Sequence, residues 1–238
     1  MCGRYTLTSS GEQVATLFDL MEMPDLQARY NMAPTQDAPV VRMLEPGGPR
    51  VLSYLRWGLV PYWADDPAIG NRMINARSES VAEKPAYRTS FKKKRCLVVT
   101  DGFYEWKKMG KAKQPYLIRR RDRQPFAFAG LWSSWKNPAD PARPLETYTI
   151  LTTDANGTIR ELHDRMPVIL DRADFGLWLD PGVGETDRLQ SLLVPAADDL
   201  LETFPVSRSV NSPAHDAADC IEPLVDHAPE EPRQASLL

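Results

Sequence analysis

The second residue of the chain is a cysteine whose position can give it two nucleophiles. The chain opens Met1-Cys2-Gly3-Arg4-Tyr5, and the small side chain of Cys2 favours removal of Met1. Cys2 would then carry a thiol and a free α-amine on neighbouring carbons, with ordinary pKa values of about 8.5 and about 8. An amine condenses with an aldehyde to an imine, on which the adjacent thiol can close to form a thiazolidine. The sequence therefore predicts a nucleophile directed at aldehydes, with a small buried structural cysteine as the alternative.

Two further residues could move protons. Glu105 lies between aromatic residues in Asp101-Gly102-Phe103-Tyr104-Glu105-Trp106, on an expected strand. Apolar surroundings raise the pKa of a carboxyl group toward the range useful for proton transfer. His163, in His163-Asp164-Arg165-Met166-Pro167, falls between an expected helix and an expected strand, which suits a residue that lines a cleft. The alternatives are an outward ion pair of Glu105 with Lys107 and a structural role for His163.

Other side chains could bind a nucleic acid. Asn75 and Arg77 lie two residues apart, so on a strand they share one face. Asn75 could hydrogen-bond a sugar or the backbone, and Arg77 could bind a phosphate, against a strand-edge hydrogen bond and a surface ion pair. Three tryptophans are candidates for stacking on bases, although packing in the core is the commoner role: Trp57, Trp63 and Trp106.

The net charge of −3 hides an uneven distribution. Residues 88–123 hold thirteen basic and three acidic residues, whereas residues 212–238 hold six acidic residues and one basic residue. A basic face of this density attracts phosphate backbones, and the alternative is a solvated surface compensated by acids from elsewhere.

Composition excludes several classes of protein. No apolar run approaches the ~18 residues of a membrane span, and no signal peptide is apparent, so we expect a cytoplasmic protein. P-loop, GxGxxG and HExxH patterns are missing from the sequence, which leaves nucleotide and zinc-protease functions without support. The three cysteines have no metal-binding spacing, so no metal or cofactor is expected. Cys96 lies on an expected buried strand and Cys220 in the C-terminal segment, and neither is expected to act chemically.

Short strands dominate the expected secondary structure. Strands are predicted over residues 38–44, 49–57, 95–101, 115–120, 126–132, 146–153 and 166–170, and helices over 11–22, 154–162, 171–179 and 184–193. This order predicts an α+β fold with an antiparallel core and peripheral helices. Residues 1–211 are expected to form one domain. Residues 212–238, which are acidic and rich in Pro and Ala, are expected to form a disordered tail.

Six motifs, in their order along the chain, resemble the SRAP family, the abasic-site processing proteins first named SOS response-associated peptidases. The resemblance runs from Met1 to about Asn211. Its motifs are Cys2-Gly3-Arg4-Tyr5, Tyr30-Asn31-Met32-Ala33-Pro34, Trp57-Gly58, Ile74-Asn75-Ala76-Arg77-Ser78-Glu79, Asp101-Gly102-Phe103-Tyr104-Glu105-Trp106 and His163-Asp164-Arg165-Met166-Pro167.

The resemblance implies a β-barrel-like core flanked by helices, with a cleft beside a DNA channel. It implies a monomer that binds single-stranded DNA and single/double-strand junctions at abasic sites, associated with the nucleoid when on DNA. Cys2 would form a thiazolidine with the ring-opened abasic aldehyde and protect the site during replication. Weak lyase activity at the abasic site and self-removal of Met1, a peptidase activity, are further expectations.

The resemblance also assigns roles to residues. Cys2 would be the nucleophile, Asn75 would position the linked sugar, Glu105 would shuttle protons, and His163 would assist catalysis and reversal. Residues implied to contact DNA are Arg4, Asn31, Pro34, Trp63, Arg77, Trp106, Thr152 and Arg165. One departure concerns stacking, because family members can carry two adjacent tryptophans where this chain has Trp63-Ala64.

Two alternative functions come from other classes of protein. A Met-Cys-Gly start also resembles N-terminal-nucleophile amidotransferases, in which the thiol attacks an amide. These proteins typically carry Ile where this chain has Arg4, and they need a second catalytic or partner domain. The other alternative is a non-catalytic single-stranded DNA-binding protein, in which replacing Cys2 would change nothing.

Overall fold

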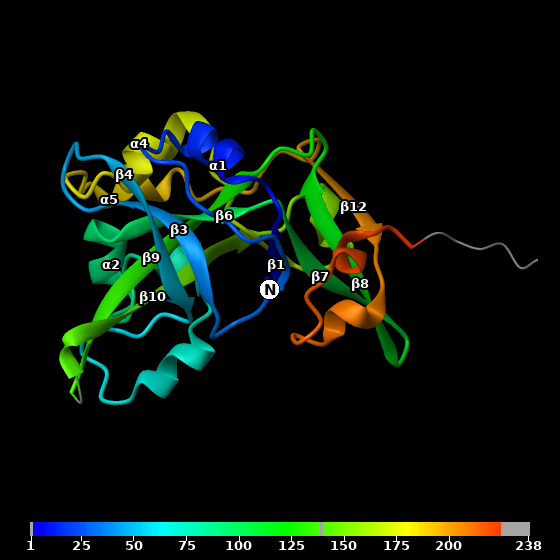
Figure 1. Cartoon of the computed structure of the whole chain (residues 1–238), viewed down its shortest axis with the longest axis horizontal. Helices are drawn as coiled ribbons and strands as arrows, with labels where there is room; N and C mark the ends of the chain where they lie inside the picture. Colours follow the sequence, from blue (N-terminus) through cyan, green and yellow to red (C-terminus); the bar gives the residue numbers. More distant parts are fainter. Residues whose placement is uncertain (1, 139, 225–238) are drawn as a thin grey trace, which may run out of the picture.

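A closed barrel of five strands forms one side of the molecule, on the left in Figure 1. The computed structural model describes residues 2–138 and 140–224 of the chain. Going round the barrel, the strands are β10 (Asp140–Asp154), β4 (Arg50–Trp57), β3 (Asp37–Met43), β6 (Arg95–Thr100) and β9 (Phe126–Asn137), which pairs back with β10. Every pairing is antiparallel except that of β10 with β4. Closure leaves no unpaired barrel edge, and β6 is buried along its whole length.

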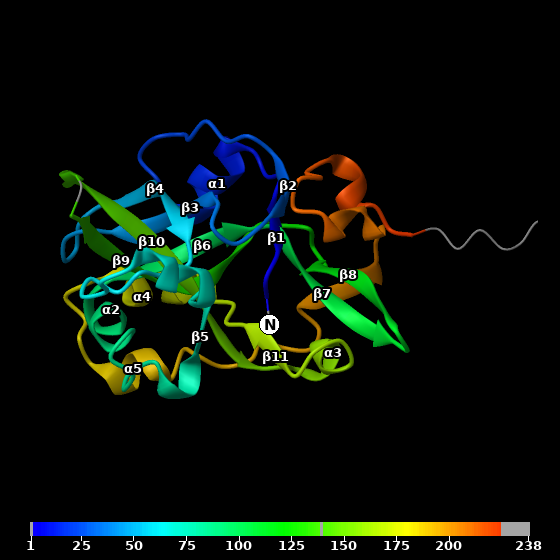
Figure 2. The same ribbon diagram turned by 90° about the horizontal axis from the view of Figure 1, so that it is seen from below.

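A second, antiparallel sheet of five strands lies beside the barrel. Its order is β12 (Leu201–Pro205), β8 (Ala112–Arg120), β7 (Gly102–Met109), β1 (Tyr5–Leu7) and β2 (Arg29–Met32). Strand β1 lies between the barrel and the rest of this sheet in both views (Figures 1 and 2). The buried hydroxyl groups of Tyr5 and Tyr148 meet at 2.6 Å, so β1 is tied to barrel strand β10.

Two short strands extend the barrel on either side of β10. Strand β5 (Asn75–Arg77) runs parallel to β10, and β11 (Arg165–Pro167) runs antiparallel to it. Both pair with the same residue, since Thr152 lies opposite Arg77 on one side and Pro167 on the other. The segments around Asn75 and His163 therefore come together at one end of β10.

The helices are short and peripheral, which confirms the expected α+β class and the barrel-like core. They are α1 (Gly11–Phe18), α2 (Arg88–Lys93), α3 (Gly157–Arg160), α4 (Phe175–Leu179) and α5 (Thr186–Gln190), with 3-10 turns at Pro67–Arg72, Ser78–Ser80, Arg172–Asp174, Arg208–Asn211 and Ala218–Ile221. Ser10 begins α1 with a capping box, and Phe18 stacks on Phe175 of α4 at 5.3 Å. None of the helices within residues 2–138 and 140–224 is long and apolar enough to cross a membrane.

The structure differs from the sequence-based expectations in two helices. The predicted helix over residues 11–22 ends at Phe18, because Asp19 takes a left-handed conformation with φ of 53°. The predicted helix over 154–162 is reduced to α3, since β10 extends to Asp154.

The C-terminal segment also differs from expectation. Residues 206–224, which we call the C-terminal clasp, fold back against the second sheet, although a disordered tail was expected from residue 212 onward. Cys220, in the clasp, is fully buried with Tyr104, Leu117, Val206 and Val210. The expectation of disorder was wrong here because it rested on the acidic composition and did not take account of this buried apolar contact. The rest of the expected tail, 225–238, lies outside the described residues.

Candidate functional site

The strand pairing of β1 places Cys2 beside Glu105. Tyr5 lies opposite Phe103 in the antiparallel pair of β1 and β7, and the Tyr104 N–H donates to the Arg4 carbonyl at 3.0 Å. Continuing this register places Gly3 opposite Glu105. Cys2 is fully buried at this position. The N-terminal nucleophile and the candidate proton carrier therefore occupy one site.

Asn75 reaches this site from the barrel. Its side-chain nitrogen donates to the Cys2 carbonyl oxygen at 2.8 Å, and its own oxygen is buried with no hydrogen-bond partner among the described residues. The Trp57-Gly58 motif explains how Asn75 is placed. The Trp57 indole donates to the Ile74 carbonyl at 2.9 Å, and Gly58, at φ of 126°, packs so tightly that an added Cβ would lie 2.5 Å from the Gly70 oxygen. Trp57 is therefore a core residue. Packing in the core was the alternative to base stacking that the sequence left open.

The electrostatics of the site favour neutral forms of its acidic groups. Glu105 is only 3% exposed. Burial raises the pKa of its carboxyl group. Burial, followed by the charge of Glu105, raises the pKa of the Cys2 thiol. The resting thiol is therefore protonated at neutral pH, and it must lose that proton during any reaction.

His163 completes the group from the loop between α3 and β11. Its Nδ1 accepts a hydrogen bond from the Arg165 backbone N–H at 3.0 Å and lies 2.7 Å from the Asp164 carboxylate. Because Nδ1 is occupied by the adjacent residues Asp164 and Arg165, Nε2 is the nitrogen that could reach a substrate. Strands β5 and β11 both pair with Thr152 of β10, so the loop that carries His163 lies at the same end of the barrel as Asn75. Cys2, Asn75 and Glu105 therefore share one site, and the His163 loop lies next to it.

Arg4 lies next to this group with one edge of its guanidinium fixed. Its Nη1 donates to the Asn31 side-chain oxygen at 2.6 Å and to the Val210 carbonyl at 2.8 Å, and its Cζ lies 5.9 Å from the Trp106 ring centroid. Its Nε is buried and has no partner among the described residues. An arginine held through one nitrogen keeps other N–H groups that can bind an anion such as a phosphate.

The sequence of the whole domain matches one known family. Residues 1–213 match the model described as SOS response associated peptidase (SRAP). The chain belongs to the SRAP family. This membership agrees with the motif order seen in the sequence.

Several relatives of this SRAP protein are named as abasic site processing proteins. YoaM of Bacillus subtilis is 42% identical over 226 residues, which cover 93% of this chain and 98% of that protein. YedK of Escherichia coli is 30% identical, with 94% of this chain and 100% of the relative covered. HMCES of Gallus gallus is 35% identical over 85% of this chain and 68% of its own length.

A solved structure supports the fold. The crystal structure of a protein from Bacteroides thetaiotaomicron superposes with a TM-score of 0.82 over 94% of this chain and 100% of its own, at 24% identity. At that identity the likeness shows a shared fold alone.

Three of the side chains expected to contact DNA are placed as structural groups of the SRAP domain. Asn31 and Thr152 are fully buried. The Thr152 hydroxyl lies 3.5 Å from the Ala76 carbonyl. Arg165 has a side chain only 11% exposed and bridges Glu79 and Asp154 at 2.6 and 2.7 Å. These three residues shape the site from inside and do not face solvent.

The remaining candidates for DNA contact are accessible. Arg77 is exposed, and Pro34 is half-buried in the turn after β2. Trp63 is 50% exposed, and its neighbour Tyr62 is 61% exposed. Trp106 is half-buried, with its indole nitrogen donating to the Asn211 side chain at 2.8 Å.

The basic stretch at 88–123 does not form a single face. Arg95 is buried and donates to five backbone carbonyls, while Arg119 and Arg120 are paired with Glu202 and Asp122. Helix α2 and strand β8, which carry its two ends, lie on opposite sides of the SRAP domain (Figure 1). The expectation of one basic face is therefore wrong.

Asp101 is a positioning residue to which the sequence assigned no role. Its carboxylate accepts hydrogen bonds from the backbone and the hydroxyl of both Thr8 and Ser9. These bonds fix the chain directly after β1 and so anchor the strand that carries Cys2. The position of Asp101 within a family motif was the available signal, but its partners lie more than ninety residues away in sequence.

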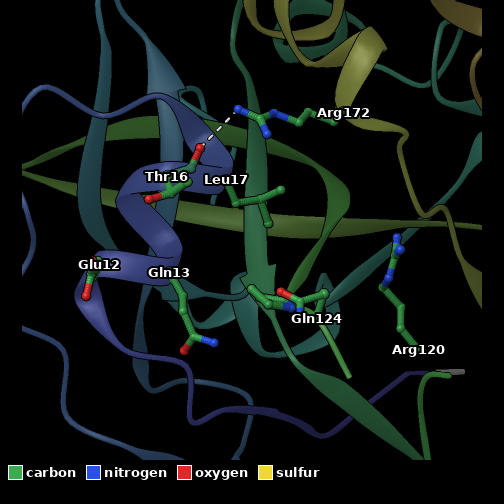
Figure 3. A pocket seen from close by; sticks show the side chains of 8 residues that line it. Glu12, Gln13, Thr16, Leu17, Arg120, Gln124 and Arg172 are labelled. Atoms are coloured by element: carbon green, nitrogen blue, oxygen red, sulfur yellow. Dashed lines mark hydrogen bonds between the residues drawn. The ribbon is translucent and has the colours of Figure 1, made fainter. Parts of the chain in front are cut away.

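A cavity of about 470 Å³ lies elsewhere, against α1 (Figure 3). Its arginines are already engaged, since Arg172 donates to the Thr16 carbonyl at 3.1 Å and pairs with Asp19, and Arg120 pairs with Asp122. None of the four candidate catalytic residues lines it. This cavity is therefore separate from the candidate site at the end of β1.

Proposed function

We propose that this SRAP protein processes abasic sites in single-stranded DNA and at single/double-strand junctions by forming a covalent thiazolidine through Cys2. The observation that carries the proposal is the placement of the Cys2 end of β1 against Asn75 and Glu105. The names of the relatives support the substrate class. The proposal requires that Met1 be removed, by the protein itself or by an aminopeptidase.

The proposed reaction begins at the amine. The lone pair of the Cys2 α-amine adds to the aldehyde carbon of the ring-opened sugar, and loss of water gives an imine. Glu105 accepts a proton from the amine and delivers one to the departing hydroxyl group. In the ring opening that precedes this addition, His163 donates a proton through Nε2 to the ring oxygen while the C1′ hydroxyl loses its proton to solvent, so the aldehyde forms with no net change in protons. The raised pKa of the Cys2 thiol supports this order, because a protonated thiol is a weak first nucleophile.

Ring closure then converts the imine into the thiazolidine. The Cys2 sulfur adds to the imine carbon, its proton passes to the imine nitrogen, and a five-membered ring results. The net change is an aldehyde plus an aminothiol giving a thiazolidine plus water, so no oxidant, metal or cofactor enters the balance. Asn75 orients the reacting residue through the Cys2 carbonyl. An imine that fails to close could lose the 3′ phosphate by β-elimination, which would account for weak lyase activity.

Side chains near the site and on the surface would hold the DNA. Arg4 and Arg77 are the proposed phosphate contacts, and Trp63, Trp106 and Pro34 are the proposed contacts to bases. Tyr62, exposed beside Trp63, supplies an aromatic face where this chain lacks a second tryptophan.

The decisive test uses protein whose intact mass confirms loss of Met1. This protein is mixed with a single-stranded oligonucleotide that carries one abasic site, and the products are separated on a denaturing gel. A heat-stable, slowly migrating band is expected for the wild type, and none for Cys2→Ala. Cys2→Ser retains the amine, so its link should survive only after borohydride reduction of the imine.

Other results would favour the rival functions. DNA retardation on a native gel without a covalent band would identify a non-covalent single-strand binder. Failure to bind DNA combined with release of ammonia from glutamine would identify an amidotransferase of the N-terminal-nucleophile class.

A further inference from the structure

The C-terminal clasp, residues 206–224, touches the site through Arg4. One nitrogen of that guanidinium donates both to the Val210 carbonyl, which belongs to the clasp, and to the side chain of Asn31. The clasp also reaches Trp106, whose indole nitrogen donates to Asn211 at 2.8 Å. The two side chains that flank Cys2 and Glu105 are thus both bound by the same distant segment.

Asn31 transmits the position of the clasp to Arg4. Its side-chain nitrogen donates to three clasp carbonyls, those of Val210, Ser212 and His215, at 3.2, 2.9 and 2.6 Å. Because carbonyl oxygens accept and cannot donate, they fix which end of the amide is nitrogen. The amide oxygen must then face Arg4, which it meets at 2.6 Å. The orientation of Asn31 therefore depends on the clasp.

Asp216 attaches the clasp to strand β2. Its carboxylate accepts from the backbone N–H groups of Tyr30 and Asn31, at 2.5 and 3.0 Å, and from the side chain of Arg29. Strand β2 is the last strand of its sheet among the described residues, and its pairing with β1 shifts register between Arg29 and Met32, where Tyr30 and Asn31 lie. One carboxylate therefore satisfies several donors at this edge and sets the backbone of Asn31.

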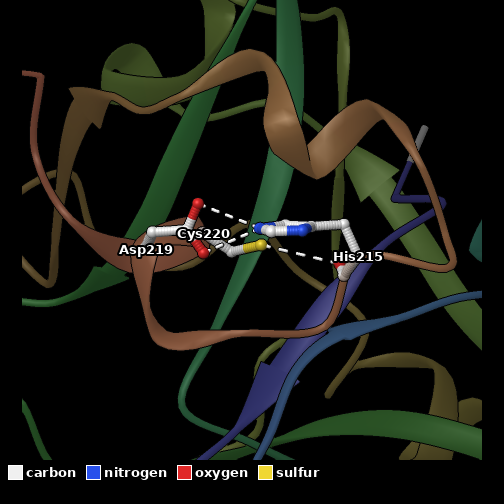
Figure 4. Close-up of side chains that lie close together, drawn as sticks. All are labelled: His215, Asp219 and Cys220. Atoms are coloured by element: carbon white, nitrogen blue, oxygen red, sulfur yellow. Dashed lines mark hydrogen bonds and ion pairs between the residues drawn. The ribbon is translucent and has the colours of Figure 1, made fainter.

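A cluster inside the clasp holds it closed (Figure 4). The Nε2 atom of His215 lies 2.7 and 2.9 Å from the two carboxylate oxygens of Asp219, and Ser209 donates to the same carboxylate at 3.1 Å. The Cys220 thiol donates to the His215 carbonyl at 3.7 Å. These groups satisfy one another, and together they hold the carbonyl that Asn31 binds.

We propose that the C-terminal clasp positions Arg4 to bind a DNA phosphate beside the abasic sugar, and that Asp216 is the positioning residue of this arrangement. Asp216 acts through Asn31 and does not itself touch DNA. It lies beyond residue 213, where the match to the family model ends. The inference rests on the proposed function, because it assigns Arg4 to the phosphate of that substrate.

The test compares Asp216→Ala and the milder Asp216→Asn with Glu222→Gln, which removes an exposed acid of the same clasp. All three changes are made in the full chain. At saturating abasic DNA, Asp216→Ala should slow formation of the covalent link by about tenfold or more, because small misplacements at a reacting centre are costly. Asp216→Asn should slow it less, and Glu222→Gln should match the wild type.

A second readout separates positioning from a loss of fold. Affinity is measured against salt concentration, with single-stranded DNA that carries a tetrahydrofuran analogue lacking the aldehyde. Loss of one phosphate contact should reduce the slope of log K against log salt by about 0.7. A protein that is merely less stable, yet folded at the temperature of the assay, keeps the wild-type slope. If Asp216→Ala does not melt cooperatively, Asp216→Asn decides.

Each outcome bears on a different claim. A wild-type rate and slope in the Asp216 variants would overturn the inference, as would an equal loss in Glu222→Gln. If the wild type forms no covalent link at all, the proposed function has failed. The salt slope alone then decides whether the clasp places Arg4 on a phosphate.

Discussion

The side chain of Asn75 donates a hydrogen bond of 2.8 Å to the backbone carbonyl of Cys2. Asn75 belongs to β5, which is paired to the barrel, whereas Cys2 precedes β1 of the second sheet. The bond therefore crosses between the two sheets. It acts on the backbone of the residue that carries both proposed nucleophiles, so we expect it to orient that residue.

Asn75→Ala should slow formation of the covalent link by about tenfold, which corresponds to about 1.4 kcal/mol for a lost orienting hydrogen bond. Asn75→Asp should be slower still, because its carboxylate cannot donate and would face the Cys2 carbonyl oxygen. Single-turnover rates at saturating DNA measure both effects. A wild-type rate in Asn75→Ala would show that the bond does not orient the reaction.

Glu105→Gln should slow the link by about 100-fold, because it removes the group that transfers protons. Burial raises the pKa of Glu105, so the wild-type rate should fall with decreasing pH in a range above that usual for glutamate. This acidic limb should be lost in the variant, which can be followed in rates measured across pH. A limb that persists in Glu105→Gln would assign it to another group.

The same substitution should stabilise the folded protein at high pH. A buried carboxyl with a raised pKa favours folding while it is protonated, and this contribution is lost as the pH rises through its folded-state pKa. Glu105→Gln should therefore melt at a higher temperature than the wild type at about pH 8, and at a similar temperature at about pH 4. Equal melting temperatures at both pH values would contradict the raised pKa.

Arg165 and Arg77 should respond in opposite ways to substitution. Arg165→Lys keeps the charge but loses the forked contacts to Glu79 and Asp154, so it should lower the free energy of unfolding by about 2 kcal/mol. Its salt slope for DNA should stay unchanged. Exposed Arg77→Ala should leave stability unchanged and reduce the slope by about 0.7. Urea unfolding and salt titration test the pair, and the reverse pattern would make Arg165 the DNA contact.

Trp63→Ala should weaken binding of single-stranded DNA by about 1–3 kcal/mol, as expected for loss of one stacking side chain. Trp63→Phe should retain part of that affinity, since a ring remains. Fluorescence anisotropy with a labelled oligonucleotide measures both variants, and Tyr62→Ala reports whether the neighbouring ring contributes. Unchanged affinity in Trp63→Ala would exclude stacking at this position.

The sequence predicted the strands with strong hydrophobic patterns and missed those defined by pairing. Strands β3 and β4 were expected over residues 38–44 and 49–57 because apolar residues cluster on either side of a Pro-Gly turn. Strands β1 and β5 are three residues long, too short to carry a pattern, and exist because β7 and β10 supply their hydrogen bonds. The C-terminal clasp was missed because composition shows that the segment is acidic. It does not show that Asp216 accepts hydrogen bonds from the backbone of β2.

The candidate site was predicted unevenly for a related reason. Cys2 and Glu105 could be identified because their chemistry depends on residue type and immediate neighbours. Asn31 and Arg165 were assigned to DNA although they are held inside the domain, because a motif preserves residue type without stating which way a side chain points. Asp101 shows the opposite failure, since its partners could be recognised only in three dimensions.

The contact between Arg4 and Val210 has a consequence for how the protein is made. These residues are 206 positions apart, so almost the whole domain must be synthesised before they can meet. During translation, Cys2 would leave the ribosome long before the segment that binds Arg4 has been synthesised. The reactive end would thus acquire its final geometry only as translation of the domain finishes, which delays activity until the protein can be released.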